Sequence, residues 1–195
     1  MKLAAVVPAA GLSARMGREK ILLPAGEISV LERVLATLAA AGVGQRVVVL
    51  RPDLPEAREV ARRAGATVVW NPRPREEMLL SIRLGMAEVP READAFFVWP
   101  ADHPAVLPET LSLLAASAAR DRVALPLFGG RRGHPALVGA DLAEAIGAIP
   151  AGEGLRHLWR SHPEVLIEVP VGDPGVLVNL DTPEDYRAFL ARQGQ

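Results

Sequence analysis

Short apolar runs rich in β-branched residues alternate along this chain with segments of helical character, and this alternation limits the possible folds. The runs lie at residues 3–7, 46–50, 67–70, 95–99 and 123–127. Strands that alternate with helices are typical of a parallel sheet that is covered by helices on both faces. We therefore predict an α/β fold with a mostly parallel central sheet.

The segments between these runs carry helix signals. In the first one, Ser29 and Glu32 can form a capping box, an apolar stripe follows, and Gly42 ends the helix. We expect further helices at 55–64, 76–87, 108–119, 141–146 and 183–192, whereas 129–162 is less regular. Ligands of open α/β sheets bind beyond the carboxyl ends of the strands. Functional side chains are therefore expected in the loops that follow strands.

Length and composition narrow the class of protein. A chain of 195 residues with 50% hydrophobic content can form one domain, 1–195. A net charge of −1 provides no overall field to attract nucleic acid or an anionic membrane. The lack of cysteine excludes thiolate chemistry and fits a cytoplasmic protein. No apolar run approaches the roughly 18 residues that a membrane span needs, so we expect no membrane partner.

The segment at 8–20, PAAGLSARMGREK, follows the first run and has the composition of a phosphate-binding loop. Gly11 and Gly17 let backbone N–H groups approach an anion, Ser13 can donate a hydroxyl, and Arg15 and Lys20 bring positive charge. Its spacing differs from G-x-x-x-x-G-K-[ST] and from G-x-G-x-x-G, which disfavours Walker ATPases and dinucleotide enzymes. An ordinary strand-to-helix loop is the structural alternative. Lysine occurs at only one other position, however, and a compact ammonium suits a phosphate oxygen.

Two carboxylates follow other apolar runs. Asp102 lies in WPADHP after 95–99, and Asp181 lies in VLVNLDTPEDY before a predicted helix. Carboxylates beside phosphates need a bridging cation, and Mg²⁺ combines one or two carboxylates with phosphate oxygens and water. The structural alternatives are a turn before Pro104 for Asp102 and helix capping before Pro183 for Asp181.

Other polar residues could contact a nucleotide. Asn71 follows the third run and precedes a predicted helix that carries Ser81 and Gly85, so amide and small side chains there could read a base edge. A turn-forming asparagine before proline needs no ligand, however. The segment RRGHP at 131–135 suits a second phosphate group, although His134 could equally be a turn residue bonded to backbone.

Together these motifs resemble the nucleotidyltransferases of the molybdenum cofactor cytidylyltransferase and guanylyltransferase group. The loop of that family has the form LAAG or LAGG followed by x-S-x-R-M-G-x-x-K-x-L-L-P, and this chain has PAAGLSARMGREKILLP at 8–24. Further matches are N-P at Asn71, S-x-x-x-G at Ser81, D-x-P at Asp102, R-G-H-P near His134 and D-T-P-E-D-Y at Asp181. The resemblance therefore covers nearly the whole chain.

The resemblance implies a three-layer Rossmann-like fold of the GT-A type. It also implies Mg²⁺ as cofactor and transfer of a nucleoside monophosphate from a triphosphate to a phosphorylated acceptor such as molybdopterin cofactor, with release of pyrophosphate. A molybdoenzyme or its chaperone is a candidate partner. By the family pattern Arg15 and Lys20 would hold phosphates, and Asp102, with Asp181, would hold the metal. The nucleotide would be bound by Ala9, Ala10, Gly11, Ser13, Gly17, Asn71, Ser81 and His134.

Position 10 bears on the choice of nucleotide. Alanine there resembles the cytidylyl branch of the family, whereas guanylyl members usually carry glycine, so CTP is favoured over GTP.

The type of acceptor decides whether the reaction needs a general base. A phosphate monoester acceptor is already largely a dianion near neutral pH and needs no general base. An alcohol acceptor would need a base such as His134 or His103.

Several positions depart from the family pattern. Pro8 replaces the usual leucine, His103 stands where many members have Gln or Met, and Glu77 replaces a glycine that lets backbone approach the nucleotide. The G-D-x-G-x-R pattern is shortened to GEGLR at 152–156. These departures leave open a guanylyltransferase, or an inactive nucleotide-binding regulatory or cofactor-delivery protein on the same fold. A nucleotide-sugar glycosyltransferase would more naturally carry a D-x-D pair than ADHP.

Overall fold

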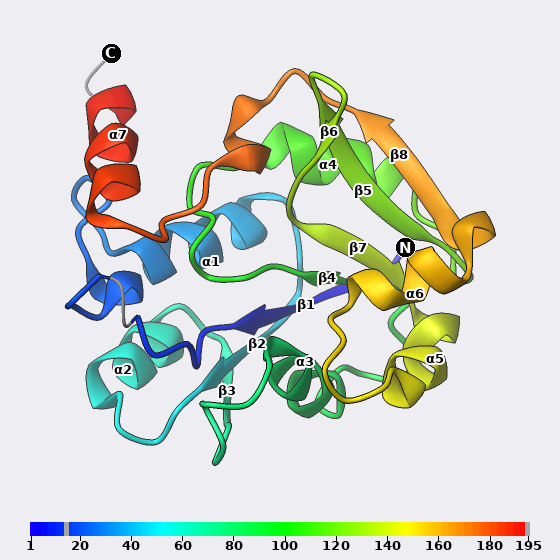
Figure 1. Ribbon diagram of the computed structural model, residues 1–195, viewed down its shortest axis with the longest axis horizontal. Coiled ribbons are helices and arrows are strands. Elements are labelled where there is room, and N and C mark those ends of the chain that lie inside the picture. The colour runs from blue at the N-terminus through cyan, green and yellow to red at the C-terminus, as the bar shows by residue number, and fades with distance from the viewer. Residues whose placement is uncertain (14–15, 194–195) are drawn as a thin grey trace.

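One mixed sheet forms the centre of the molecule (Figure 1). The computed structural model describes residues 1–13 and 16–193. Within these residues, eight strands lie in the order β3-β2-β1-β4-β7-β5-β6, and β8 also pairs with β5. Their bounds are β1 (Leu3–Pro8), β2 (Gln45–Leu50), β3 (Thr67–Trp70), β4 (Ala95–Val98), β5 (Val123–Phe128), β6 (Arg131–Arg132), β7 (Ala136–Gly139) and β8 (Leu166–Pro170).

The sheet is mostly parallel, as the sequence predicts. Strands β1 to β4 pair in parallel, and β8 pairs in parallel with β5. Strand β7 runs antiparallel between β4 and β5, and β6 forms a short hairpin with β5. The sequence did not reveal β6 and β7 in the irregular segment 129–162, nor β8. A two-residue and a four-residue strand leave almost no periodicity to detect.

Helices occur where the sequence predicts them, with shifted ends, and a further helix, at Arg156–Ser161, lies in the segment described as less regular. They are α1 (Val30–Ala40), α2 (Pro55–Arg63), α3 (Met78–Met86), α4 (Pro108–Ala116), α5 (Ala143–Ala148), α6 (Arg156–Ser161) and α7 (Pro183–Gln193), with 3-10 turns η1 (Lys20–Leu22), η2 (Ala140–Leu142), η3 (Pro163–Val165) and η4 (Pro174–Leu177). The capping box is confirmed, because Ser29 Oγ accepts from Glu32 N at 3.2 Å and Glu32 Oε2 accepts from Ser29 N at 2.8 Å. No helix within the described residues is long and apolar enough to cross a membrane.

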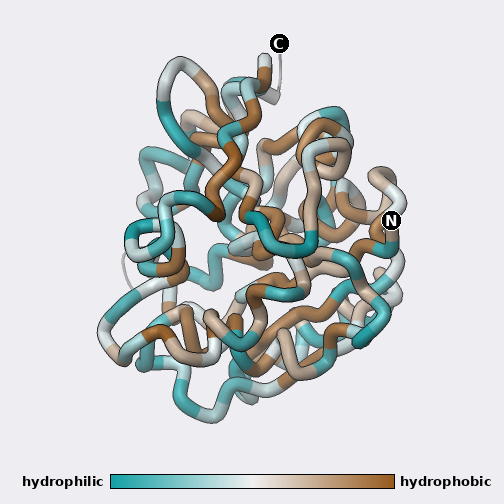
Figure 2. The backbone as a smooth tube through the Cα atoms, turned by 90° about the vertical axis from the view of Figure 1, so that its right-hand side faces the viewer, coloured by the Kyte–Doolittle hydropathy of each residue, from teal (hydrophilic) through white to brown (hydrophobic). Residues whose placement is uncertain are grey.

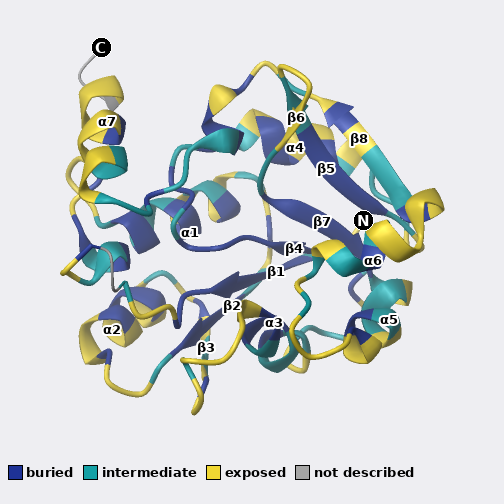
Figure 3. Cartoon of the chain, in the orientation of Figure 1, coloured by how far each residue is buried: buried dark blue, intermediate teal, exposed yellow. Residues whose placement is uncertain are grey.

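Strand β1 separates two cores. Ala5 and Val7 belong to the core that includes side chains of α1, α2 and α4, whereas Ala4 and Val6 belong to the core with α3, α5 and α6. Figure 2 shows hydrophobic stretches in the interior of the chain path, and Figure 3 shows β1, β4 and β7 as buried. The result is a three-layer α/β fold whose central strands end at a shared edge.

Helix α3 lies unusually close to the sheet at Gly85. A Cβ atom there would lie 2.4 Å from Val6 Cγ1 and 3.0 Å from Val49 Cγ2, both on buried strands. We expect Gly85→Ala to lower the free energy of unfolding by about 1–3 kcal/mol, because overpacking forces the backbone or side chains to shift. Urea unfolding measures this loss.

A matched control is Gly147→Ala in α5, where a Cβ atom meets nothing within 4 Å. This variant is expected to be as stable as the parent or slightly more stable, because alanine reduces the freedom of the unfolded chain. Equal unfolding midpoints for the two variants would contradict the close packing of α3 on β1.

Candidate active site

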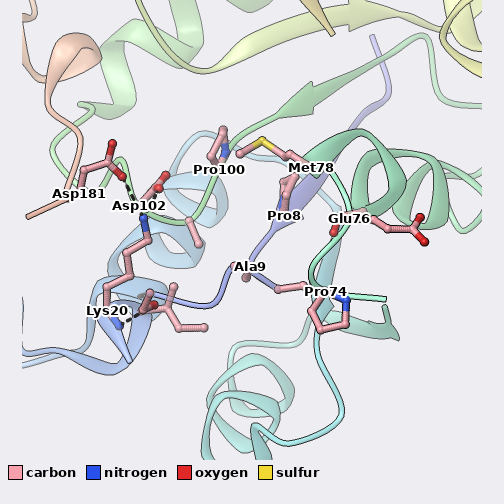
Figure 4. Close-up of a pocket in the computed structure, with 15 residues that line it drawn as sticks. Pro8, Ala9, Lys20, Pro74, Glu76, Met78, Pro100, Asp102 and Asp181 are labelled. Atoms are coloured by element: carbon pink, nitrogen blue, oxygen red, sulfur yellow. Dashed lines mark hydrogen bonds and ion pairs between the residues drawn. The ribbon is translucent and has the colours of Figure 1, made fainter. Parts of the chain in front are cut away.

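A cavity of about 300 Å³ lies at the edge where β1 and β4 end (Figure 4). This volume is at the lower end of the range for small-molecule sites. Its walls come from the loops after β1 and β4, the start of α3 and the segment before α7. The lining residues are Pro8, Ala9, Ala10, Gly11, Ser13, Lys20, Ile21, Pro74, Glu76, Met78, Ser81, Pro100, Ala101, Asp102 and Asp181.

The glycine loop forms one wall of the cavity. Ser13 has a left-handed backbone with φ of 48°, which is uncommon for a residue other than glycine. Its hydroxyl donates to Glu19 Oε1 at 3.0 Å and accepts from Lys20 N at 3.3 Å. Gly17 has φ of 62° and is not among the lining residues. The predicted phosphate ligand Arg15 lies outside the described residues.

The Lys20 ammonium lies between two carboxylates. Lys20 Nζ is 2.5 Å from Asp102 Oδ2 and 3.4 Å from Asp181 Oδ1, and Figure 4 shows these side chains pointing toward one another. Asp102 and Lys20 side chains are each only 14% exposed, so water screens this pair weakly. The backbone carbonyl of Asp102 accepts from Leu180 N at 2.9 Å, which places Asp181 beside the turn after β4. Three residues far apart in sequence thus form one charged cluster.

The carboxylates fit a divalent metal ion. Asp102 Oδ1 is buried and accepts no hydrogen bond from the described residues, so one hard oxygen ligand is available. Those residues contain no group of three or more metal-binding side chains. An ion held by Asp102 and Asp181 would therefore take its other ligands from phosphates and water, which is the usual arrangement for Mg²⁺.

The capping alternative for Asp181 does not describe this helix start. Asp185 N donates to Thr182 Oγ1 at 3.2 Å, and Thr182 N donates back to Asp185 Oδ2 at 2.8 Å. Thr182 is thus the residue that caps α7 reciprocally. The Asp181 carboxylate lines the cavity instead.

Asn71 lies behind the cavity wall. The residue is 1% exposed, its Nδ2 donates to Ser81 Oγ at 2.9 Å, and its Oδ1 accepts from Arg73 N at 2.8 Å. Ser81 lines the cavity, whereas Asn71 is not among the lining residues. Asn71 is therefore placed to orient Ser81, which faces the cavity, and a direct contact of Asn71 with a base stays a prediction.

His134 also lies outside the lining of this cavity. Its ring packs on His103, with ring centroids 4.3 Å apart and planes inclined at 48°. Burial, together with the nearby His103 and Arg156, lowers the pKa of His134 to about 4, against an opposing effect of Asp102. The ring is neutral at pH 7, so the positive charge of the RRGHP motif lies on Arg131 and Arg132. The ring can still donate one hydrogen bond, and contact of His134 with a nucleotide stays a prediction.

The low pKa of His134 makes stability depend on pH. Because its folded pKa of about 4 lies below the value of 6.5 for the free side chain, the unfolded chain binds more protons between these values. We expect the free energy of unfolding to fall by roughly 3 kcal/mol from this group as the pH drops from 7 to 4. His134→Gln should remove much of that slope in urea titrations at several pH values.

Two other histidines, one buried and one exposed, help to interpret that measurement. Burial also lowers the pKa of His103, so part of the slope is expected to persist in the His134 variant. The control is His162→Gln, which replaces a side chain that is 59% exposed. An equal slope in the parent and in His134→Gln would contradict a buried neutral ring.

Two departures from the family pattern contact each other. Glu77, at the start of α3, accepts from Gly152 N at 3.0 Å through Oε2. Its neighbours Glu76 and Met78 line the cavity, but Glu77 does not. The replacement of glycine at position 77 is thus accompanied by a contact to the shortened loop at 152–156, away from the cavity.

Sequence reasoning missed a pair behind the loop. Arg51, directly after β2, donates through Nη1 to Gly11 O at 2.6 Å and forms an ion pair with Glu19. The rule that functional groups follow strands could have singled out Arg51, since β2 lies next to β1. Its partner Glu19 could not be identified from the sequence, because only the fold brings the two residues together.

A glycine loop after the central strand, an ammonium and two carboxylates at one sheet edge are the groups with which α/β proteins bind phosphates and a divalent ion. Residues 5–165 match the MobA-like NTP transferase domain. The chain belongs to the MobA-like NTP transferase family, which confirms the resemblance seen in its motifs.

Individual relatives agree with this assignment. The chain is 28% identical to molybdenum cofactor cytidylyltransferase from Escherichia coli K12 over 185 residues, or 93% of this chain and 92% of that protein. A nucleotidyl transferase structure from Methanothermobacter is similar with a TM-score of 0.86 and 28% identity, covering 97% and 96% of the two chains. The structure of Rv0371C from Mycobacterium tuberculosis H37Rv, solved in complex with manganese, is similar with a TM-score of 0.82 and 25% identity, covering 98% of this chain and 99% of that one.

Proposed function

We propose that the protein is a Mg²⁺-dependent cytidylyltransferase that moves CMP from CTP to a phosphorylated small-molecule acceptor such as molybdopterin cofactor. The observation that carries this proposal is the charged cluster of Lys20, Asp102 and Asp181, which lines the same cavity as the glycine loop. Support comes from the curated relative, which is a molybdenum cofactor cytidylyltransferase by name.

The donor nucleotide would occupy the cavity with its phosphates toward Lys20. Gly11 and Ser13 border the path that these phosphates would take, and Ser81 and Ala10 lie on the wall left for the nucleoside. Ala10 lines the cavity, and its methyl group leaves less room there for a larger base than a glycine would. This favours a pyrimidine over a guanine.

The acceptor would approach from the other side of Asp181. A second cavity of about 500 Å³ shares Asp181 with the first and is also lined by Arg131, Asn179 and Arg192. Guanidinium groups suit an anionic acceptor, since they bind phosphate oxygens in a fork. An acceptor there and a donor in the first cavity would meet at the carboxylates.

The reaction would be an in-line attack. An acceptor phosphate oxygen forms a bond to the α-phosphorus of CTP while the bond to the bridging oxygen breaks and pyrophosphate leaves. The Lys20 ammonium would stabilise the charge on pyrophosphate, and Asp102 and Asp181 would hold the metal. When bound, Mg²⁺ supplies electrostatic stabilisation to the phosphates. No proton transfer from the acceptor is needed, because a phosphate monoester is largely a dianion at pH 7.

The experiment is pyrophosphate release with CTP, GTP, ATP and UTP in turn, each with Mg²⁺ and a panel of phosphorylated acceptors that includes molybdopterin cofactor. We expect release with CTP that depends on the acceptor. A preference for GTP would overturn the interpretation of Ala10. Binding of CTP without release, across the whole panel, would instead favour a nucleotide-binding regulatory or delivery protein.

A further inference from the structure

Arg51 is a largely buried arginine that lies behind the glycine loop. It is the first residue after β2, and its side chain is 12% exposed. It is not among the residues that line the cavity, so it does not border the space for a ligand. Burial of an arginine is costly unless its donors are used. The hydrogen-bond and ion-pair partners of the guanidinium therefore indicate the role of the Arg51 side chain.

The guanidinium connects the two ends of the loop. Nη1 donates to the carbonyl oxygen of Gly11 at 2.6 Å, and Nη2 forms an ion pair with the Glu19 carboxylate. Nε lies 2.8 Å from Oδ1 of the exposed Asp53, an ion pair that lacks the geometry of a hydrogen bond. Because a guanidinium is planar and its donors are fixed relative to one another, these contacts set the distance between Gly11 and Glu19.

Glu19 extends this constraint to the ligand-facing residues. Its other carboxylate oxygen, Oε1, accepts from the Ser13 hydroxyl at 3.0 Å, and that hydroxyl accepts from Lys20 N at 3.3 Å. Glu19 also directly precedes Lys20 in the chain. One ion pair thus stabilises the left-handed backbone at Ser13 and the position from which the Lys20 ammonium reaches Asp102.

We infer that Arg51 is a positioning residue for the donor triphosphate, an inference that rests on the proposed function. Arg51 and Glu19 fix the loop in the conformation that presents Lys20 and the loop backbone to the β- and γ-phosphates. Without the pair, the entropy cost of ordering the loop is paid when the triphosphate binds. A nucleoside monophosphate lacks those two phosphates, so its binding depends less on the loop.

The test compares CTP with CMP in Arg51→Met, with Mg²⁺ present. We expect the dissociation constant of CTP, measured by calorimetry, to rise roughly tenfold because binding must now order the loop, and that of CMP to stay within about twofold of the parent. The KM for CTP should rise more than kcat falls. Arg51→Lys should restore only part of the CTP affinity, since one ammonium cannot reproduce the two-armed contact.

The matched control is Arg46→Met, within the strand β2 that precedes Arg51. Arg46 donates to the carbonyls of Ala64 at 3.1 Å and Val43 at 3.5 Å, which is a structural role far from the loop. This variant should lose stability and keep the parental ratio of CTP to CMP affinity. An equal loss of both ligands in Arg51→Met, or an altered ratio in Arg46→Met, would overturn the positioning role.

Hydrogen exchange separates this inference from the proposed function. In the protein without nucleotide, the loop amides at 9–13 and 16–20 should exchange faster in Arg51→Met than in the parent or Arg46→Met. Equal exchange in all three proteins would overturn the positioning role even if the enzyme is active. A parent protein that binds no nucleotide and releases no pyrophosphate would overturn the proposed function, whatever the exchange rates.

Discussion

Asp102→Asn is expected to lower the rate of pyrophosphate release by roughly three orders of magnitude, because a metal ion contributes several kcal/mol of charge stabilisation. The amide keeps the shape of the side chain but removes the negative charge that faces Lys20 at 2.5 Å, and it replaces one of the two carboxylate oxygens with an NH2 group that cannot bind a cation. The backbone carbonyl that holds Leu180 is unchanged. Steady-state rates with saturating CTP and Mg²⁺ measure the loss.

Asp141→Asn is the matched control for this variant. Asp141 pairs with Arg120 at 2.9 Å on the surface, and its side chain is 54% exposed. The control should keep the parental rate, and both variants should unfold near the parental temperature. A rate for Asp102→Asn within tenfold of the parent would show that this carboxylate does not hold the metal.

Much of the fold could be predicted from local sequence signals. The five apolar runs became β1, β2, β3, β4 and β5 because β-branched side chains pack well in a buried sheet. The capping box at Ser29 and Glu32 uses only contacts three residues apart, so sequence alone defines it. Strand β7 depends instead on the pairing of Ala136–Gly139 between β4 and β5, which no local pattern encodes.

The candidate site was predictable in location and less so in detail. Parallel strands end at one edge, and this rule predicts the glycine loop after β1 and Asp102 after β4 at that edge. Asp181 follows the 3-10 turn η4 rather than a strand, and the hydrogen bond from Leu180 N to the Asp102 carbonyl brings it to the same edge. The direction in which each side chain points could not be predicted from this rule. Asn71 points to Ser81 within the wall, and Arg51 points to Gly11 behind the loop, because buried polar groups turn toward whatever partners the tertiary fold supplies.

Lys20→Met is expected to have two opposite effects. Pyrophosphate release should fall by at least about a hundredfold, since a preorganised charge at the leaving group is lost. Binding of Mn²⁺ in the absence of nucleotide should become at least about tenfold tighter, because like charges a few ångströms apart repel by a few kcal/mol in a partly buried site. The reason lies in the geometry of the protein without ligand, where the ammonium lies 2.5 Å from Asp102 and 3.4 Å from Asp181.

The ammonium would therefore compete with a divalent ion for the same carboxylates, and phosphates that attract Lys20 away would favour entry of the ion. Electron paramagnetic resonance of free Mn²⁺ measures the affinity of each variant. Lys2→Met, at the other lysine of the chain, is the control and should match the parent. The double variant Lys20→Met/Asp102→Asn should lose the gain in affinity. Unchanged or weaker Mn²⁺ binding by Lys20→Met would show that Lys20 and the metal do not share this site.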